Sequence, residues 1–193
     1  MASYSIGVLV GSARKGSINQ KLANALSKLG GKDFEFRPIK IDDLPMFNQD
    51  LEEPAPASVE RFRKDIRASD GLMFVTPEYN RSTTPLLLNA ISWGSRPYGH
   101  NAFTAKPGMI AGASRGVIRT AAAQAHLRDI LGVVDVRLIG QPEAYVHFTD
   151  DLLAADGTIA DETQRTALKK KIDAFIDWVV LVTDGKKEKK AAA

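Results

Sequence analysis

Hydrophobic positions along the chain gather in five short runs, separated by longer stretches in which apolar residues recur with a helical period. Most runs have no regular polar face, as expected of parallel strands that are buried on both sides. Each run is followed by Gly, Pro, Ser or Asp, which favour a turn or loop. We therefore predict strands over residues 4–10, 34–41, 71–76, 109–113 and 133–139.

The stretches between these runs predict amphipathic helices. After the first run, Ile18, Leu22 and Leu26 share one helical face, and Gly30 ends the helix. Further helices are predicted around residues 59–66, 84–93, 117–131 and 168–179. The third of these five begins at Thr84-Pro85, with proline at the first helical position, and is apolar on more than one face. Such a helix is expected to be buried both by its own sheet and by a partner subunit.

Strands that alternate with helices imply right-handed crossovers and a doubly wound parallel sheet. Five strands with five helices favour a flavodoxin-like α/β fold, a three-layer sandwich whose five-stranded parallel sheet has the order 2-1-3-4-5. In this order a ligand binds at the carboxyl ends of the first and third strands. We expect one such domain over residues 1–184, followed by a basic, disordered tail over residues 185–193.

Composition excludes several classes of function. The 193 residues include no cysteine, so disulfides, thiolate metal sites and cysteine nucleophiles are excluded. The net charge of +3 comes from the basic stretch 186–190 and the remaining charges balance, so we expect no nucleic-acid partner. No apolar run is long enough to span a membrane, and no signal-peptide pattern is present. We expect a cytoplasmic protein.

The loop after the first predicted strand, residues 11–17, has the features of a phosphate site. Gly11 and Gly16 let the backbone approach an anion, and the following helix presents unpaired amides and the positive end of its dipole. Side-chain donors are offered by Ser12, Arg14, Ser17 and Asn19. A purely structural alternative is that Ser17 only caps its helix, with Gln20 completing a capping box. This alternative gives no role to Ser12 and Arg14.

Two familiar nucleotide motifs are absent from this loop. The spacing G-x-x-x-x-G is that of a Walker A loop, but Ser17 replaces the lysine and Ile18 replaces the serine or threonine. Magnesium-dependent hydrolysis of a nucleoside triphosphate is therefore not expected. The dinucleotide pattern G-x-G-x-x-G is also missing, which favours a mononucleotide.

Two further loops follow strands at the same edge of the predicted sheet. Pro77-Glu78-Tyr79-Asn80-Arg81-Ser82 either presents backbone groups to the edge of a ring system or forms an ordinary polar turn. Gly112-Ala113-Ser114-Arg115-Gly116 matches the nucleophile elbow G-x-S-x-G, and Asp129 or Asp135 with His147 would follow in the order of a hydrolase triad. The chain is short for a hydrolase, and an esterase would leave the 11–17 loop without a role. His100 and His126 show no metal-ligand spacing.

Taken together, the three loops resemble a known family. G-S-A-R-K-G-S-I-N after the first strand, P-E-Y-N-R-S after the third and G-A-S-R-G after the fourth are similar to the NAD(P)H-dependent FMN reductase family. The resemblance is to its branch of bacterial quinone reductases, also described as chromate reductases and ferric reductase B. It covers roughly residues 5–178, including S-R-P-Y-G at 95–99.

The resemblance implies FMN as the bound cofactor and assigns residues to it. It implies that the FMN phosphate is held by Ser12, Arg14, Ser17, Ile18 and Asn19. It implies that the isoalloxazine ring is lined by Pro77, Glu78, Tyr79 and Asn80, with Ser114, Arg115 and Gly116 on its other side. In relatives the position of Arg115 often holds a small or apolar residue.

The activity implied by the resemblance is ping-pong hydride transfer. NADH or NADPH reduces the flavin, and a quinone or another small acceptor, such as chromate, a ferric complex or an azo compound, then takes two electrons. No side chain is expected to act as a catalytic acid or base, because the flavin carries the chemistry. Arg96 is a candidate for binding the negative charge of the nicotinamide nucleotide or of an anionic acceptor, although an arginine at a helix C-terminus can also simply favour the helix dipole.

The family forms dimers or tetramers, and the apolar helix after Pro85 agrees with a homo-oligomer, for which we expect a homotetramer or a dimer. A non-enzymatic alternative is a flavodoxin that carries electrons between protein partners. Such carriers are usually acidic, whereas the body of this chain is electrically neutral.

Overall fold

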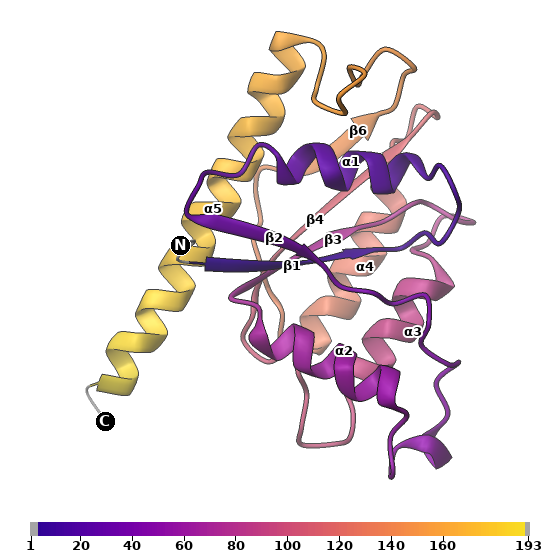
Figure 1. Ribbon diagram of the computed structural model, residues 1–193, viewed down its shortest axis with the longest axis vertical. Helices are drawn as coiled ribbons and strands as arrows, with labels where there is room; N and C mark the ends of the chain where they lie inside the picture. Colours follow the sequence, from indigo (N-terminus) through magenta and orange to yellow (C-terminus); the bar gives the residue numbers. More distant parts are fainter. Residues whose placement is uncertain (1–3, 192–193) are drawn as a thin grey trace.

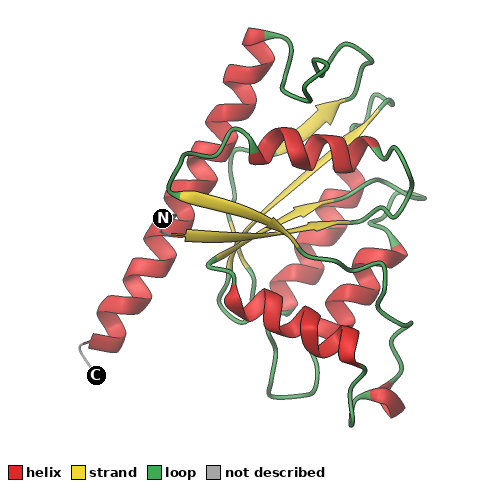
Figure 2. Ribbon diagram, in the orientation of Figure 1, coloured by secondary structure: helices red, strands yellow, loops and turns green. Residues whose placement is uncertain are grey.

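The computed structural model describes residues 4–191, and their side chains as far as residue 185. It has three layers, in which a central sheet is covered on both faces by helices (Figures 1 and 2). α1 (Ile18–Ser27) and α5 (Glu162–Ala191) pack on one face. α2 (Ala57–Ala68), α3 (Pro85–Gly94) and α4 (Ala121–Val133) pack on the other. No helix among these residues is both long and apolar enough to cross a membrane.

The sheet confirms the flavodoxin-like order. Its strands are β1 (Tyr4–Val10), β2 (Phe34–Pro38), β3 (Gly71–Val75), β4 (Pro107–Ser114), β5 (Arg137–Leu138) and β6 (Ala144–His147). Strands pair in the order β2-β1-β3-β4-β5, and every pair is parallel. Because parallel strands end at one edge, the loops after β1, β3 and β4 are neighbours in space.

The fifth strand differs from the prediction. We expected one strand over residues 133–139, but α4 continues through Val133, and β5 spans only two residues. The chain leaves β4 at Gly140-Gln141-Pro142 and returns as β6, which pairs in parallel with the last four residues of β4. Glycine and proline disfavour an uninterrupted strand here, because glycine lacks a side chain to pack and proline lacks a backbone donor.

The helices also differ from the prediction, at the start of α4, in the loop before α2 and at the end of α5. α4 begins at Ala121 rather than at residue 117, because Arg119 and Thr120 adopt left-handed φ values of 52° and 68° that cannot continue into a helix. A short 3₁₀ helix, η1 (Gln49–Leu51), interrupts the proline-containing loop before α2. The backbone from residue 185 to 191, expected to be disordered, is helical as part of α5, in keeping with the helix propensity of Lys, Glu and Ala. The side chains that make this tail basic lie outside the described residues.

The helix after Pro85 is buried mainly within its own domain. Leu87, Ala90, Ile91 and Trp93 all belong to the hydrophobic core formed with α2 and α4. The proline-containing loop after β2 covers the end of α3, where the indole of Trp93 donates a hydrogen bond to the carbonyl of Pro45. Most of the apolar surface that suggested a partner subunit is thus covered by this chain.

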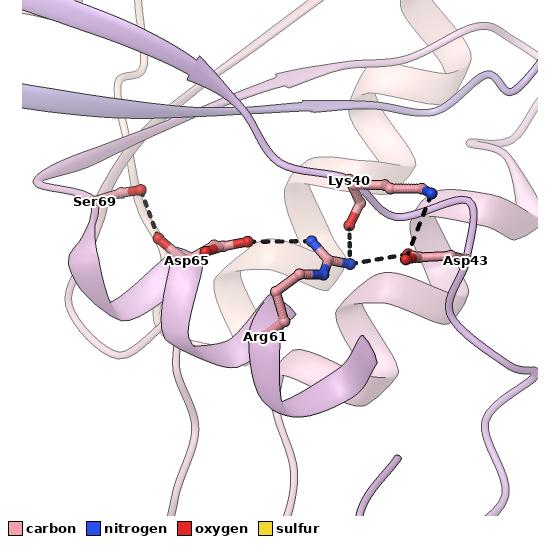
Figure 3. Close-up of polar contacts among 5 residues, drawn as sticks. All are labelled: Lys40, Asp43, Arg61, Asp65 and Ser69. Carbon is pink, nitrogen blue, oxygen red and sulfur yellow. Dashed lines mark hydrogen bonds and ion pairs between the residues drawn. The ribbon is translucent and has the colours of Figure 1, made fainter. Parts of the chain in front are cut away.

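An arginine anchors that loop to α2. The guanidinium of Arg61 donates to the carboxylate of Asp43 and to the carbonyl of Lys40, and also pairs with Asp65 one turn further along α2 (Figure 3). Ser69 closes the same helix by donating to the carbonyl of Asp65. The network holds a segment that packs on α3, the helix that begins beside the candidate site.

Candidate functional site

The loops after β1, β3 and β4 surround a cavity of about 330 Å³ at the carboxyl edge of the sheet, the loop cavity. Its lining consists of Ser12, Arg14, Ser17, Ile18, Asn19, Pro77, Glu78, Tyr79, Ala113, Ser114 and Arg115. The structure therefore brings together most of the residues that the sequence singled out in three separate loops. Gly11, Asn80 and Gly116, also singled out, are not part of this lining.

The first turn of α1 forms one wall of the loop cavity. Ser17 is its N-cap, and the Ser17 hydroxyl accepts a hydrogen bond from the amide of Gln20 at 3.3 Å. The Gln20 side chain turns to Asn24 instead of completing a capping box. Within the described structure the amides of Ile18 and Asn19 have no hydrogen-bond partner, and the first turn of α1 holds no acidic residue. Capping and an anion site are therefore compatible at this terminus.

The two glycines of the first loop have different roles. Gly16 has a φ of 71°, in the left-handed region that glycine occupies without strain, and this sets the entry into α1. A Cβ at Gly11 would instead lie 2.7 Å from the hydroxyl oxygen of Thr84 and from a methyl of Leu87. Gly11 thus allows the start of α3 to pack directly against the end of β1, rather than lining the cavity.

Asn19 ties the first loop to the end of β4. Its side-chain amide accepts from the Ala113 amide at 2.8 Å and donates to the Ala113 carbonyl at 3.0 Å, while its own side chain is almost completely buried. These two bonds occupy the backbone groups that β3 no longer reaches, because the β3–β4 register ends at Ala111. Asn19 therefore positions two walls of the cavity relative to each other.

The second loop is a tight turn. Tyr79 and Ser82 exchange both backbone hydrogen bonds, and the two residues between them, Asn80 and Arg81, have left-handed φ values of 52° and 64°. Two successive positive φ values are the signature of a type I′ turn, which places Asn80 at the tip rather than in the cavity wall. Tyr79 is half exposed at the cavity mouth.

Glu78 fixes this turn to α4. Its carboxylate accepts a hydrogen bond at 3.1 Å from the amide of Ala123, in the first turn of α4, and pairs with Arg81 at 3.2 Å. The N-cap of α4, Thr120, makes no capping bond with its side chain, so Glu78 supplies the cap from another loop. The negative charge of Glu78 is thus compensated within the protein.

The third loop does not form a hydrolase triad. The Ser114 hydroxyl bonds only within its own loop, to Gly116, in the described residues. His147 lies opposite Ser114 in the β4–β6 register but lines a different cavity, and Asp135 binds the amide of Ala105 beside the first residues of β4. The esterase hypothesis therefore has no geometric support. Arg115 instead reaches Asp150, after β6, at 2.5 Å.

A second cavity, the α1 cavity, has a volume of about 600 Å³ and lies between α1 and the segment 148–157 after β6. In Figure 1 this segment is the orange loop beside α1. Three residues line both cavities, namely Arg14, Ile18 and Arg115. The sequence did not single out this segment, because its position depends on β6, which was not predicted.

Arg96 lies away from both cavities. It follows the C-terminus of α3, whereas the N-terminus of α3 packs against Gly11, and its Nε donates to the carboxylate of Glu52 at 2.7 Å. Its guanidinium also lies 5.9 Å from the ring of Phe47. Within one chain, Arg96 is therefore not brought together with the other candidate residues.

The family model described as NADPH-dependent FMN reductase matches residues 4–151, which include all three loops of the loop cavity. The chain belongs to the NADPH-dependent FMN reductase family. This result confirms the resemblance seen in the loop sequences.

Relatives of this FMN reductase family member point to the same chemistry. It is 42% identical over 174 residues to a 2-hydroxy-1,4-benzoquinone reductase of a Burkholderia species, covering 90% of this chain and 95% of the relative. It is 42% identical over 179 residues to a quinone reductase of Pseudomonas putida, covering 92% and 96%. The solved structure of FerB, a flavoenzyme NAD(P)H:(acceptor) oxidoreductase from Paracoccus denitrificans, superposes with a TM-score of 0.89 at 43% identity, covering 91% of this chain and 97% of FerB.

Proposed function

We propose that this chain is an FMN-dependent NAD(P)H:quinone oxidoreductase and that its flavin lies in the loop cavity. Membership of the FMN reductase family and the quinone reductases among its relatives support the activity. One observation supports this location. The first turn of α1 lies in the wall of the cavity at the carboxyl ends of β1, β3 and β4, and its amides at Ile18 and Asn19 are unpaired within the described residues.

The residues of the loop cavity fit a phosphate-bearing flavin. The amides of Ile18 and Asn19 can donate to a phosphate at the positive end of the α1 dipole, and Arg14 can add a charge-assisted bond. Glu78 accepts bonds from Ala123 and Arg81, so its charge is offset before an anion enters. Pro77 and Tyr79 on one side and Ser114 on the other leave a polar-edged slot for a ring system.

Bound FMN would supply the redox chemistry, taking a hydride from NAD(P)H and passing two electrons to a quinone, which with protons becomes a quinol. The protein's part is to hold and orient. Asn19 and Glu78 fix the relative positions of the three loops through their bonds to Ala113 and Ala123. Among the residues that line the loop cavity the one carboxylate, Glu78, is already bonded, so no carboxylate base is needed or offered.

We further propose a homo-oligomer, a dimer or tetramer, in the cytoplasm. Exposed hydrophobic side chains on or next to these loops, Tyr79 at 51% and Val117 at 92% exposure, would be covered by a second subunit. The lack of cysteine suits a reducing compartment. Arg96 would then serve the nicotinamide nucleotide or an anionic acceptor only across a subunit interface, because its own loop cavity lies at the other end of α3.

The cofactor is tested on the purified protein. We expect a yellow protein that releases FMN on denaturation, and Arg14→Ala should weaken FMN binding by about ten- to hundredfold, the effect of losing a hydrogen bond to a charged group. Lys32→Ala, an exposed lysine outside both cavities, is the matched control for lost positive charge. A colourless protein that takes up no added FMN, or one that releases FAD, would contradict the proposal.

The activity is tested by oxidation of NADH or NADPH with a quinone and no other protein present. A reductase turns over under these conditions, whereas a carrier flavodoxin needs its protein partners. Absence of turnover by FMN-loaded protein would therefore favour the carrier.

A further inference from the structure

We propose that the α1 cavity binds the adenosine 2′-phosphate half of NADPH and makes this enzyme prefer NADPH to NADH. The inference rests on the proposed function, since it assumes that a nicotinamide reaches a flavin in the loop cavity. It adds a second subsite, with residues of its own, to that function.

The two cavities are adjacent at the start of α1. Arg14, Ile18 and Arg115 line both of them, so a ligand that occupied both cavities would cross these three residues. NADPH is such a two-ended ligand, because a pyrophosphate joins its nicotinamide and adenosine halves. The volume of about 600 Å³ falls within the range of small-molecule sites.

One face of α1 lines the α1 cavity with positive charge. Ile18, Lys21, Asn24 and Lys28 recur at helical spacing and all face it. Among the described residues the Lys21 ammonium makes no hydrogen bond or ion pair, and its one electrostatic influence is on Asp150. The side chain of Arg14 bonds there only to the Gly16 carbonyl. Neither cation is in direct contact with a carboxylate of the described residues, which leaves both available to a phosphate.

The carboxylates of the opposite wall are already engaged. Asp150 pairs with Arg115, and this bond, with a smaller contribution from Lys21, holds the pKa of Asp150 below its usual value. Asp156 accepts bonds from the amide and hydroxyl of Thr158. Neither carboxylate therefore cancels Lys21 by direct pairing, and the cavity keeps an excess of positive charge.

The opposite wall of the α1 cavity is held in place by hydrogen bonds of its own. Ala154 and Thr158 bond across a turn in which Gly157 has a φ of 77°, and Leu153 bridges to Ile159. Lys28 reaches across from α1 to the carbonyl of Asp156 at 2.5 Å, so this turn is tied to the helix.

An adenine has a platform between these walls. The guanidinium of Arg115 lies 5.8 Å from the ring of Phe148, and both line the α1 cavity together with Leu153. A guanidinium plane supported by an aromatic ring can stack on a purine. The purine would then lie beside Lys21, and a phosphate on its ribose would meet the unpaired ammonium group. NADH lacks that phosphate.

Binding is measured by calorimetry on the FMN-loaded protein, with adenosine 2′,5′-bisphosphate and 5′-AMP as probes. We expect the bisphosphate to bind at least tenfold more tightly than AMP, and Lys21→Ala to remove most of that difference. Lys32→Ala should leave it intact, because Lys32 lies outside the α1 cavity. Arg115→Ala should weaken both probes, since it removes the platform rather than the phosphate contact.

Steady-state kinetics give a second readout. Lys21→Ala should raise KM for NADPH by about tenfold and leave KM for NADH unchanged. Equal affinity for the two probes, no binding of the bisphosphate, or a Lys21→Ala variant that behaves as Lys32→Ala would each overturn the inference. If the inference fails in one of these ways while the wild type and Lys32→Ala still bind FMN and oxidise NADH, the proposed function stands. Protein that binds no FMN refutes the proposed function instead.

Discussion

The side-chain amide of Asn19 pairs with both backbone polar groups of Ala113, accepting at 2.8 Å and donating at 3.0 Å. Asn19 is in the first turn of α1 and Ala113 is near the end of β4, so one side chain joins two of the three loops around the cavity. Both partners are buried, and solvent cannot replace the bonds. The position is therefore structural as well as part of the cavity wall.

Asn19→Ala should reduce the free energy of unfolding by roughly 2–4 kcal/mol, because a buried amide and a buried carbonyl each lose their partner. Urea denaturation of the apo protein measures this effect without any contribution from a cofactor. Asn24→Ala is the matched control, since Asn24 is an exposed asparagine of the same helix whose side chain, among the described residues, bonds only to Gln20. Equal loss of stability in the two variants would show that the Asn19–Ala113 pair contributes little.

Glu78→Gln tests whether a carboxylate from one loop caps the helix that follows another. The substitution keeps the shape but removes the charge that Ala123 and Arg81 contact, so we expect a loss of about 1 kcal/mol in unfolding free energy. FMN affinity should change as well, because the turn carrying Tyr79 is held by this bond. Glu53→Gln, at an exposed glutamate whose side chain makes no hydrogen bond or ion pair in the described residues, serves as the control. Identical stability of the two variants would contradict the capping role.

Tyr145 should titrate at unusually high pH. Burial, together with its 2.6 Å bond to the Glu143 carboxylate, raises the pKa of Tyr145 to about 12. The folded state thus favours the neutral phenol, so its stabilising effect is complete below the unfolded pKa of about 10 and disappears as the pH rises through 12.

Ultraviolet titration of wild type and Tyr145→Phe checks this expectation. The phenol lost from the curve should be one that ionises near pH 12, and the stability difference between the two proteins should shrink above pH 10. Tyr98→Phe, which removes a phenol that is 91% exposed, is the control. A lost phenol with a midpoint at pH 10 would show that neither burial nor the Glu143 contact raises the pKa of Tyr145.

The sheet order and the meeting of three loops were predictable because they follow from local patterns and one general rule. Apolar runs identify the strands, and parallel strands place their following loops at one edge. That rule is sufficient to bring Arg14, Tyr79 and Ser114 to one cavity. The meeting of the three loops could therefore be predicted without separate evidence on the residues between the strands.

Features that depend on distant contacts were not predictable. Residues 144–147 contain only four strand residues, too few to stand out by periodicity, and their pairing with the last residues of β4 depends on where the chain turns after Leu138. The α1 cavity and the Arg115–Asp150 pair follow from that turn. Similarly, the role of Gly11 depends on the approach of Thr84 and Leu87, which are distant in sequence.

The apolar helix after Pro85 illustrates a different limit. An apolar pattern shows that a face is buried but does not identify what covers it. Here the covering elements include the proline-containing loop and α2, through Phe47, Leu44 and Phe62. The same pattern had suggested a second subunit, and a segment with several prolines was not an obvious candidate for the cover.

The last prediction concerns Arg96, whose proposed role in binding an anion requires a second subunit. Its Nε is held by Glu52, whereas its Nη groups make no hydrogen bond within the described residues and remain able to bind an anion. If a partner subunit brings this guanidinium to the mouth of a loop cavity, Arg96→Ala should leave FMN bound but slow flavin reduction at limiting NAD(P)H. Added salt should slow the wild type more than the variant, because screening weakens only the charge that is present.

Glu52→Gln separates this role from a purely structural one. It removes the charged partner of Arg96 but keeps the guanidinium, so it should lower stability about as much as Arg96→Ala while retaining more of the reduction rate. Stopped-flow reduction measures the second-order rate constants, and light scattering measures the mass against the 21.0 kDa of one chain. Equal rate constants for wild type and Arg96→Ala, or a monomer with full activity, would leave Arg96 only its bond to Glu52 and its contact with Phe47.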